Sequence, residues 1–304
     1  MGLKKLYKKF SFKNIDPREA GMIVLSQMQI EQLHSTLLTI MDDVMPFCKE
    51  NNIMCILGGG TALGAIRHKG FIPWDDDVDI NMTRESYERF IPLFKEKFKD
   101  KYWVQSPEET PVLGMPICRI RKKGTRLKTK EDFLLEEQAG VFVDIFIIEN
   151  APNNKILRFF HGVLANVSKI CLSCRRFYRD REKMLAVTGK SNTSKVRLVI
   201  GGICSLISVE KWVSINNTIN SICKNNESKY VTIPTGRWHY FGEMYERDWY
   251  CNIRECPFEG RNYPVSRDVE KYLTIIYGEN YMQVPPKEKR EEHACWEFDL
   301  GKKG

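Results

Sequence analysis

The sequence lacks the long apolar segment that a membrane-spanning helix requires. Such a helix needs roughly 20 apolar residues, and the nearest candidates are 156–173 and 196–209. The first contains Arg158, His161 and Lys169, and the second is short and contains two glycines. Both fit a buried helix, with a helix on a membrane surface as the alternative. The basic start of the chain is not followed by an apolar stretch and a cleavage site, so we expect no signal peptide.

A second cysteine pair with the spacing of a zinc site is also missing. The 10 cysteines are spread through mostly apolar stretches, which predicts buried free thiols and a reducing, cytoplasmic setting. Cys171 and Cys174 form a CxxC, but Cys251 and Cys256 have the wrong spacing to complete a standard zinc knuckle. Zinc therefore stays the lesser alternative.

No internal repeat, low-complexity tract or concentrated basic region suggests a nucleic-acid-binding protein. The net charge of +8 and pI of about 8.9 suit anionic partners such as nucleotides, phosphate polymers or an acidic membrane surface. The basic residues are scattered, with clusters at 4–9, 119–130 and 175–183. Each cluster is either a solvated face or a binding surface. We expect no nucleic-acid partner.

The apolar spacing predicts an α/β (α+β) fold, in which helices flank a mixed sheet. We expect helices over 27–50, 61–68 and 84–98, and strands over 53–57, 78–82, 102–106, 115–124 and 141–150. The chain divides into a basic N-terminal segment (1–26), a core (27–154), a mostly helical insertion (155–228) and a loop-rich C-terminal part (229–304) that completes the domain.

A stretch of five residues contains four aspartates: Asp75, Asp76, Asp77 and Asp79. Because strand side chains alternate between faces, Asp77 and Asp79 should project to the same side of strand 78–82. Neighbouring carboxylates repel unless a cation lies between them, and Mg²⁺ prefers oxygen ligands and usually binds phosphate oxygens too. A solvated acidic turn is the alternative, but the acids lie between Trp74 and Ile80, which favours a Mg²⁺ (or Mn²⁺) site.

A third carboxylate, Asp144, stands in the middle of the apolar run GVFVDIFII. A lone buried acid is costly unless it is paired with an arginine or bound to a metal. If its strand lies beside 78–82, Asp144 reaches the same ion as Asp77 and Asp79. Three such carboxylates suit metal-dependent transfer of a phosphorus-containing group.

A glycine turn precedes the acids. Gly59 and Gly60 allow a ligand to approach the backbone closely, Thr61 opens a helix, and a helix N-terminus favours phosphate. The turn is not a Walker motif, because no Gly-Lys-Ser/Thr follows, and its glycine spacing is not that of the dinucleotide-binding fingerprint.

Three strings together resemble the LicD family, the bacterial phosphocholine transferases related to fukutin and fukutin-related protein within the nucleotidyltransferase superfamily. They are GGGTALGAIRHKGFIPWDDDVDI, GVFVDIFIIE and FEGRNYPVSRDVEKYLTIIYGENYMQVPPKEKREEH. The resemblance covers roughly 30–150 and 230–293 and leaves out 155–228.

The resemblance implies a nucleotidyltransferase-like core that transfers phosphocholine from CDP-choline to a sugar of a cell-surface glycan (teichoic acid, lipopolysaccharide or capsule) and releases CMP. By position, the residues that would hold Mg²⁺ are Asp77, Asp79 and Asp144, and those that would line the diphosphate are Gly59, Gly60 and Thr61. The general base is Asp144 or Asp75, unless the metal alone lowers the pKa of the sugar hydroxyl.

Basic residues supply further candidate substrate contacts. Arg67 and His68 either contact phosphates or interact with the helix dipole. Arg119 and Arg121 alternate on a strand and share a face, as a phosphate clamp or a surface pair.

The closing string supplies three more candidates. Lys289, Arg290 and His293 are expected to close over the nucleotide, with a structural role as the alternative for His293. The C-terminal part also contains a group of aromatic residues, which is either core or a cage for the choline ammonium: Trp238, Tyr240, Phe241, Tyr245, Trp249 and Tyr250.

Two other functions remain open. In the first alternative, the same fold transfers phosphoethanolamine, phosphoribitol, phosphoglycerol or a nucleotidyl group. In the second, the protein is a non-catalytic binding module. The intact acid set disfavours the second alternative. The glycan acceptor is expected to be lipid-linked. Lys4, Lys5, Lys8 and Lys9 fit peripheral contact with the inner face of an anionic plasma membrane.

Overall fold

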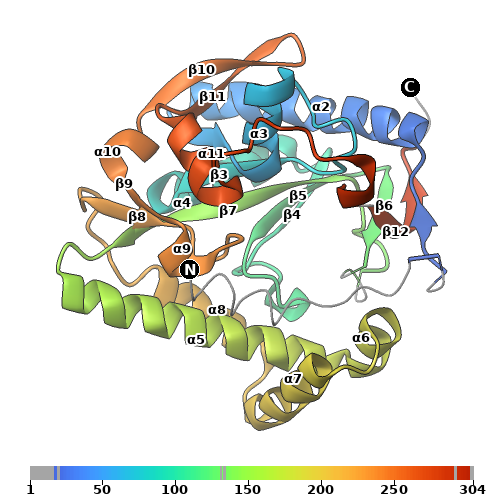
Figure 1. Cartoon of the computed structure of the whole chain (residues 1–304), viewed down its shortest axis with the longest axis vertical. Coiled ribbons are helices and arrows are strands. Elements are labelled where there is room, and N and C mark those ends of the chain that lie inside the picture. Colours follow the sequence, from blue (N-terminus) through green and yellow to red (C-terminus); the bar gives the residue numbers. More distant parts are fainter. Residues whose placement is uncertain (1–16, 19–20, 131, 133–134, 291–292, 302–304) are drawn as a thin grey trace.

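A mixed β-sheet forms the centre of the molecule (Figure 1). The computed structural model describes residues 17–18, 21–130, 132, 135–290 and 293–301. The main strands run in the spatial order β2 (Cys55–Leu57), β3 (Asp79–Thr83), β7 (Phe142–Ala151), β5 (Cys118–Lys122) and β4 (Tyr102–Gln105). Only β3 and β7 pair in parallel among these neighbours. The end of β7 also pairs with β8 (Tyr230–Thr232), which continues to β9 (Met244–Glu246). The predicted mixed α/β fold is confirmed.

The other strands form two small sheets. One contains β1 (Ile23–Val24), β12 (Ala294–Asp299) and β6 (Arg126–Thr129), and the other is the hairpin of β10 (Ile253–Phe258) and β11 (Arg261–Ser266).

Helices surround the central sheet in two groups. Those of the core are α2 (Gln27–Glu50), α3 (Gly59–His68), α4 (Arg84–Phe98) and α11 (Val269–Tyr277). Those of the insertion are α5 (Lys155–Arg179), α6 (Arg181–Thr188), α7 (Asn192–Ile203) and α8 (Val209–Asn220). The short helical pieces are α9 (His239–Gly242), α10 (Arg247–Tyr250), η1 (Pro111–Leu113), η2 (Cys204–Leu206) and η3 (Lys287–Lys289). The insertion runs along one side of the molecule (Figure 1).

Sequence signals explain the long core helices. Ser26 caps α2 in a capping box with Gln29, and Thr83 caps α4 through the backbone N–H of Ser86. The apolar stripe of α2, including Leu33 and Leu37, is fully buried in the main core. The expected helices at 27–50 and 84–98 and the helical character of 155–228 are therefore confirmed.

The structure moves two boundaries that matter for the acids. The helix expected from Thr61 begins at Gly59. The strand expected at 78–82 begins at Asp79, and Asp77 lies in the segment just before it. Both acids still line one cavity.

One helix of the insertion exceeds the apolar content that we expected. Within the described residues, α5 is long and apolar enough to cross a membrane by length and composition alone, and the pair 192–206 and 209–220, bent by 92°, qualifies only if it is counted as one span. However, one face of α5 packs on the rest of the chain, including His161, Ala165 and Leu172.

A glycine fixes how close α3 lies to the segment that leads into the acids. A Cβ on Gly64 would stand 2.4 Å from the carbonyl oxygen of Gly70 and 3.2 Å from the backbone nitrogen of Ile72. Both atoms belong to backbone and have little freedom to move. Gly64 therefore sets the position of the helix whose first turn meets Asp79.

Replacing Gly64 with alanine should lower the free energy of unfolding by about 1–3 kcal/mol, because the added methyl group pushes two backbone segments apart. The matched control is Gly202→Ala, also inside a helix, where the nearest atom to the new Cβ is the Tyr178 ring at 3.6 Å. There we expect an increase of up to about 1 kcal/mol from the better helix propensity of alanine. Urea unfolding of both variants measures the difference, and equal effects would contradict this account.

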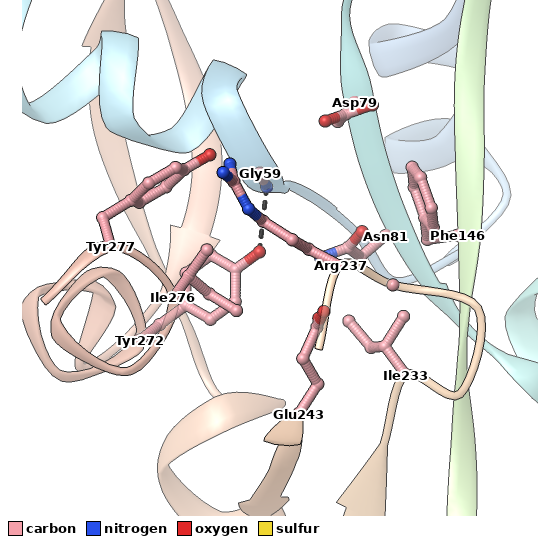
Figure 2. A pocket seen from close by; sticks show the side chains of 11 residues that line it. Gly59, Asp79, Asn81, Phe146, Ile233, Arg237, Glu243, Tyr272, Ile276 and Tyr277 are labelled. Atoms are coloured by element: carbon pink, nitrogen blue, oxygen red, sulfur yellow. Dashed lines mark hydrogen bonds between the residues drawn. The ribbon is translucent and has the colours of Figure 1, made fainter. Parts of the chain in front are cut away.

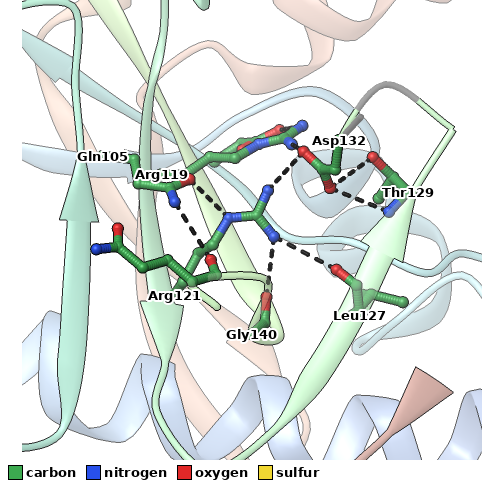
Figure 3. Close-up of polar contacts among 9 residues, drawn as sticks. Gln105, Arg119, Arg121, Leu127, Thr129, Asp132 and Gly140 are labelled. Atoms are coloured by element: carbon green, nitrogen blue, oxygen red, sulfur yellow. Dashed lines mark hydrogen bonds and ion pairs between the residues drawn. The ribbon is translucent and has the colours of Figure 1, made fainter. Parts of the chain in front are cut away.

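A buried arginine joins β5 to the loop that follows β6 (Figure 3). The side chain of Arg121 is fully buried. It donates to Gln105 Oε1 at 2.7 Å and to the Gly140 carbonyl at 3.0 Å, and it forms an ion pair with Asp132 Oδ1 at 2.9 Å. The expectation that Arg121 contacts substrate, or lies on the surface, is wrong, because every polar group of its guanidinium faces the protein interior.

Replacing Arg121 with methionine should lower the free energy of unfolding by about 3–5 kcal/mol, because Asp132 then loses a buried charge partner. The control is Arg126→Met, which removes a partly exposed ion pair with Glu297 and should change stability by about 1 kcal/mol or less. Chemical denaturation followed by far-UV circular dichroism compares them. A loss at Arg121 no larger than at Arg126 would refute a structural role for this network.

Candidate active site

Parallel pairing of β3 and β7 brings two predicted acids together. Asp79 and Asp144 are register partners on the adjacent strands, and the Asp144 N–H donates to the Val78 carbonyl at 2.9 Å. The condition under which Asp144 could join the other acids, that its strand lies beside β3, is therefore met. The acids meet because the two strands run in the same direction and their side chains at partner positions point to the same face of the sheet.

A cavity of about 670 Å³ opens over the acidic end of β3, within the range typical of ligand pockets. Its acidic lining residues are Asp75, Asp77 and Asp79. Its basic lining residues are Arg67, Arg237, Lys289, Arg290 and His293. The acids come from one segment and the cations from several, so folding assembles a site with opposite charges on its walls. The cavity therefore has groups for both a cation and an anion.

The glycine turn supports the acids more directly than expected. A Cβ on Gly59 would stand 2.2 Å from Asp79 Oδ2, and one on Gly60 would stand 2.7 Å from Asp75 Oδ2. The Gly60 backbone N–H partly offsets the rise in the pKa of Asp79, and the Gly59 N–H donates to the Tyr272 hydroxyl at 2.9 Å. Only residues without a side chain allow the acids to lie this close to the turn.

Thr61 lies behind the site. Its hydroxyl accepts the Asp79 backbone N–H at 2.8 Å, its side chain is buried, and it is not among the residues that line the cavity. Its expected contact with a diphosphate is therefore wrong. Gly60 lines the large cavity, and Gly59 lines a smaller one beside it.

Crowding raises the affinity of these carboxylates for protons. Burial, followed by repulsion from Asp79, raises the pKa of Asp77 well above its usual value. Burial, followed by repulsion from Asp144, does the same to the pKa of Asp79. Within the described part of the chain, Asp77 has no ion-pair partner. Two or more crowded carboxylates in this state favour a bound cation.

Asp144 is held differently from the other acids. Arg119 donates to it through Nε at 2.6 Å and Nη2 at 3.2 Å, and also contacts Asp132 at 3.3 Å. Burial raises the pKa of Asp144 in spite of this pair. Asp144 does not line the large cavity. The structure thus contains the buried aspartate–arginine ion pair that was the alternative to a metal ligand. Arg119 points at Asp144 and does not lie on the surface.

A second set of potential metal ligands lies nearby. Among the described residues, the group of three whose ligand atoms all lie within 4.8 Å of one another is Asp75, Asp76 and His293. His293 Nδ1 stands 2.5 Å from Asp76 Oδ1, and its Nε2 stands 3.8 Å from Asp75 Oδ1. Two carboxylates and an imidazole can hold a divalent ion. The set Asp77, Asp79 and Asp144 stays a prediction.

Arg67 and His68 have distinct places. Arg67 lines the cavity and donates to the Tyr281 carbonyl at 2.9 Å, while its Nε donates to His68 Nε2 at 2.9 Å. His68 does not line the cavity, and burial, then Arg67, lowers its pKa. His68 therefore supports Arg67 in this structure, and its expected contact with substrate stays a prediction.

Residues near the end of the closing string line the cavity beside Trp74. The Arg290 guanidinium lies 4.1 Å from the centre of the Trp74 ring, and its Nε donates to the Pro285 carbonyl at 3.1 Å. Lys289, Arg290 and His293 all line the cavity, as do Trp74 and Asp75. Their contact with a nucleotide stays a prediction.

Several lining residues were missed from the sequence. Arg237 and Tyr277 line both cavities, and Asn280 and Gln283 line the larger one. Arg237 belongs to a segment in which only the aromatic residues attracted attention, and Tyr277 stands in the Tyr-Gly of the closing string. The sequence shows that residue 237 is an arginine, but it does not show which residues surround Arg237 in the fold.

The aromatic residues of the C-terminal part are core. Tyr240, Tyr245, Trp249 and Tyr250 are buried, and Tyr245 stacks on Tyr250 with ring centroids 4.2 Å apart. None of them lines either cavity. The core alternative is thus correct for these four.

Comparisons with known proteins agree with this geometry. Residues 52–155 match the family described as LicD/FKTN/FKRP, nucleotidyltransferase domain. The chain is 25% identical over 284 residues to the lipopolysaccharide cholinephosphotransferase LicD of Haemophilus influenzae, covering 90% of this chain and 98% of the relative. It is also 35% identical over 83 residues to an uncharacterised protein of Rickettsia typhi, covering 24% of this chain and 27% of the relative.

The matched range includes the glycine turn, the aspartate cluster and Asp144, which are the elements that meet around the parallel pair of strands. The similarity to the Haemophilus protein extends beyond them through the insertion and the closing segment. Residues 52–155 therefore match a LicD-family nucleotidyltransferase domain.

Proposed function

We propose that this protein transfers phosphocholine from CDP-choline to a sugar hydroxyl of a cell-surface glycan, with release of CMP, in a reaction that depends on a divalent metal. The observation that carries the proposal is one cavity with three carboxylates on one wall and four arginine or lysine side chains on the others. The similarity to a lipopolysaccharide cholinephosphotransferase over nearly its whole length supports the choice of phosphocholine.

The residues fit a divalent ion of the Mg²⁺ or Mn²⁺ class. Asp75, Asp77 and Asp79 offer oxygen ligands at the cavity wall, and the glycine turn leaves no side chain between them and the helix. When bound, the ion neutralises negative charge on the diphosphate and on the leaving phosphate. Asp75 belongs both to these cavity-lining acids and to the set of Asp75, Asp76 and His293, so we expect it as a ligand in either of those arrangements. It is not part of the set of Asp77, Asp79 and Asp144.

The cationic wall suits the diphosphate. Arg67, Arg237 and Lys289 line the same cavity as the acids, and arginine binds phosphate oxygens through paired N–H groups. The acceptor oxygen attacks the phosphorus that carries choline, and the bond from that phosphorus to the oxygen of CMP breaks. CMP leaves with the bonding electrons, and the cations stabilise the charge that builds up on it.

The hydroxyl proton passes to a carboxylate. Asp75 is better placed than Asp144, because Asp75 lines the cavity while both oxygens of Asp144 are bonded to Arg119. Arg119 then acts as a positioning residue, which keeps the strand β7 acid ionised beside Asp79.

The setting follows from the substrates. A donor nucleotide is a cytoplasmic compound, and a lipid-linked glycan acceptor would keep the enzyme at the inner face of the plasma membrane. The basic residues Lys4, Lys5, Lys8 and Lys9, which we expected to contact an anionic membrane, lie outside the described residues. The alternative with the same fold transfers phosphoethanolamine, phosphoribitol, phosphoglycerol or a nucleotidyl group.

A donor panel tests the reaction. Purified protein is given CDP-choline, CDP-ethanolamine, CDP-ribitol or CTP with Mg²⁺, and release of CMP or pyrophosphate is measured. We expect CMP from CDP-choline, its loss with EDTA, and a drop of about a thousandfold or more for Asp77→Asn and Asp79→Asn, because a metal site supplies several kcal/mol of stabilisation.

Matched variants separate the two ligand sets. Asp100→Asn, an exposed acid outside the cavity, should have no effect. His293→Ala should abolish Mn²⁺ binding, measured by electron paramagnetic resonance, only if Asp75, Asp76 and His293 hold the ion. If the protein turned over CTP and none of the other donors, the proposed function would have to be nucleotidyl transfer. If it bound metal and nucleotide without any turnover, the non-catalytic alternative would be favoured.

A further inference from the structure

A second, smaller cavity adjoins the acidic one. It measures about 140 Å³ and is lined by the apolar or aromatic side chains of Phe146, Ile233, Tyr272, Ile276 and Tyr277. It shares Asp79, Arg237 and Tyr277 with the large cavity, so a ligand that occupies one can extend into the other. Figure 2 shows these side chains around the first turn of α3.

A buried carboxylate lies at the wall of the small cavity. Glu243 is only 3% exposed, yet it lines the cavity. It accepts the Trp238 backbone N–H at 2.8 Å and the Tyr245 hydroxyl at 3.4 Å. A Cβ on Gly236 would stand 2.4 Å from both of its oxygens, so the loop is built around this carboxylate. Such burial is costly without a compensating charge.

No cation in the described part of the chain lies within ion-pair distance of Glu243. The nearest charges that act on it are Lys169 and Arg237. Lys169 donates instead to the carbonyls of Pro234 and Gly236 at 3.1 and 3.2 Å, and the guanidinium of Arg237 lies toward Gly59 and Tyr277 in Figure 2. Burial raises the pKa of Glu243 to about 7. A positive ligand group would supply the missing partner.

We infer that the small cavity binds the trimethylammonium group of the donor, with Glu243 as its counter-charge and Tyr272 and Tyr277 as aromatic walls. This inference rests on the proposed function. An apolar protein cavity of about 150 Å³ takes a molecule the size of benzene, so 140 Å³ accommodates four carbon or nitrogen atoms beside the chain that leads to phosphorus.

The walls select against a primary ammonium. A trimethylammonium group has no N–H donors and needs only negative charge and apolar or aromatic contact, which these walls supply. An ethanolamine ammonium has three donors. Glu243, Asp79 and Asn81 also line the cavity and offer acceptors to some of them, but a donor that faces Phe146, Ile233 or Ile276 is left unsatisfied, at a cost. The cavity therefore selects for choline over ethanolamine.

A neutral isostere of choline tests the counter-charge. The wild-type protein and Glu243→Gln are each given CDP-choline and its 3,3-dimethylbutyl analogue, in which carbon replaces nitrogen. We expect the wild type to prefer CDP-choline by at least tenfold in kcat/KM, and Glu243→Gln to lose most of that preference. Glu246→Gln, an exposed acid on β9, is the matched control and should keep it.

The outcomes separate this inference from the reaction itself. If the wild type releases no CMP from CDP-choline, the proposed function fails. If it does so and Glu243→Gln keeps the same preference for the charged donor, the subsite is wrong. A general loss of folding in Glu243→Gln would lower both rates together, and Glu243→Asp then serves as the second variant, in which a restored preference would support the charge.

A different observation concerns the outer face of α5. Seven large apolar side chains there are 47–66% exposed: Ile156, Leu157, Phe159, Phe160, Leu164, Val167 and Ile170. Their spacing of three and four residues places them on one side of the helix. The opposite side packs on the protein through residues such as His161, Ala165 and Ser168.

Helix α7 and the turn after it extend this surface. Val196, Val199, Ile203 and Leu206 recur every three or four residues and are 44–92% exposed. α7 packs against α5, since a Cβ on Gly201 would stand 2.3 Å from the Cys174 carbonyl oxygen. Exposed apolar groups in such number mark an interaction surface.

The two helices that carry this surface contain basic residues and no acid, although Asp180 and Glu182 lie in the segment between them. Residues 155–179 contain six lysines or arginines and no acid, and 183–209 contain no acid either. Lys155, Lys190 and Lys195 are exposed. A protein partner with an acidic rim would suit the cations but not so wide an apolar face on two helices. An anionic bilayer offers both, with headgroup charge above and acyl chains below.

We propose that the outer faces of α5 and α7 dock on an anionic phospholipid surface, with α5 lying along the membrane and not crossing it. Crossing would require α5 to leave its buried contacts, in which Lys169 holds the loop at 234–236. Interfacial binding uses only side chains that are already exposed.

Flotation with vesicles tests this surface. The full chain should bind vesicles of phosphatidylglycerol and phosphatidylcholine, bind pure phosphatidylcholine at least tenfold less, and release in high salt. Phe160→Ser with Val199→Ser should lower binding at least tenfold. Met28→Ser, an equally exposed apolar residue on α2, is the matched control.

Two results would overturn the docking surface. One is wild-type flotation that Phe160→Ser with Val199→Ser leaves unchanged, which would assign binding to another part of the chain. The other is a dimer in sedimentation that these substitutions dissolve, with no vesicle binding, which would make the face an interface between two copies.

Discussion

The site depends on the repulsion among carboxylates that the fold forces together. Parallel pairing of β3 and β7 fixes Asp79 opposite Asp144, and the preceding loop adds Asp77 at the cavity wall. Burying one such charge costs several kcal/mol when it is unpaired. Of the site's acids, Arg119 forms an ion pair with Asp144 and not with Asp77 or Asp79, and those two carboxylates line the cavity. An arrangement of this kind stabilises the fold only weakly and binds a cation well.

The neighbouring structure is shaped to keep these acids in place. Glycines in the first turn of α3 remove side chains that would collide with Asp79 and Asp75, and Tyr272 bonds the Gly59 N–H from α11. The helix N-terminus, which alone would attract phosphate, is thus turned toward the protein's own carboxylates and a tyrosine. In the proposed reaction, recognition of phosphate would therefore fall to the arginines that line the cavity.

The local part of this arrangement is predictable from sequence, and the long-range part is not. The apolar spacing gives α2 and α4 nearly to the residue, and a lone acid in an apolar run correctly placed Asp144 beside Asp79. Arg121 was misjudged because alternation along a strand says which residues share a face but not whether that face is covered. Here the loop carrying Asp132 covers it.

Glu243 and Arg237 show the same limit from the other side. Neither residue belongs to a sequence motif. Both line a cavity together with Tyr272, Phe146 and Asp79, which lie 29 or more positions away in the sequence. No spacing rule applies to residues that meet only through the topology of the sheet. The aromatic residues near them in the sequence suggested a choline cage by their number. In the structure their rings pack against one another in the core, as Tyr245 does on Tyr250.

The insertion joins the two surfaces that matter. The inner side of α5 holds the loop of Arg237 through Lys169 and packs Gly162 against Tyr240 and Phe241, while its outer side is apolar. A helix with its side chains is about 10 Å across. Whatever contacts the outer face of α5 therefore lies about one helix diameter from the loop that lines both cavities. If the proposed membrane docking and transfer reaction both hold, an acceptor at that surface would need only a short reach to the donor phosphorus, and the helical insertion would have a place in the reaction.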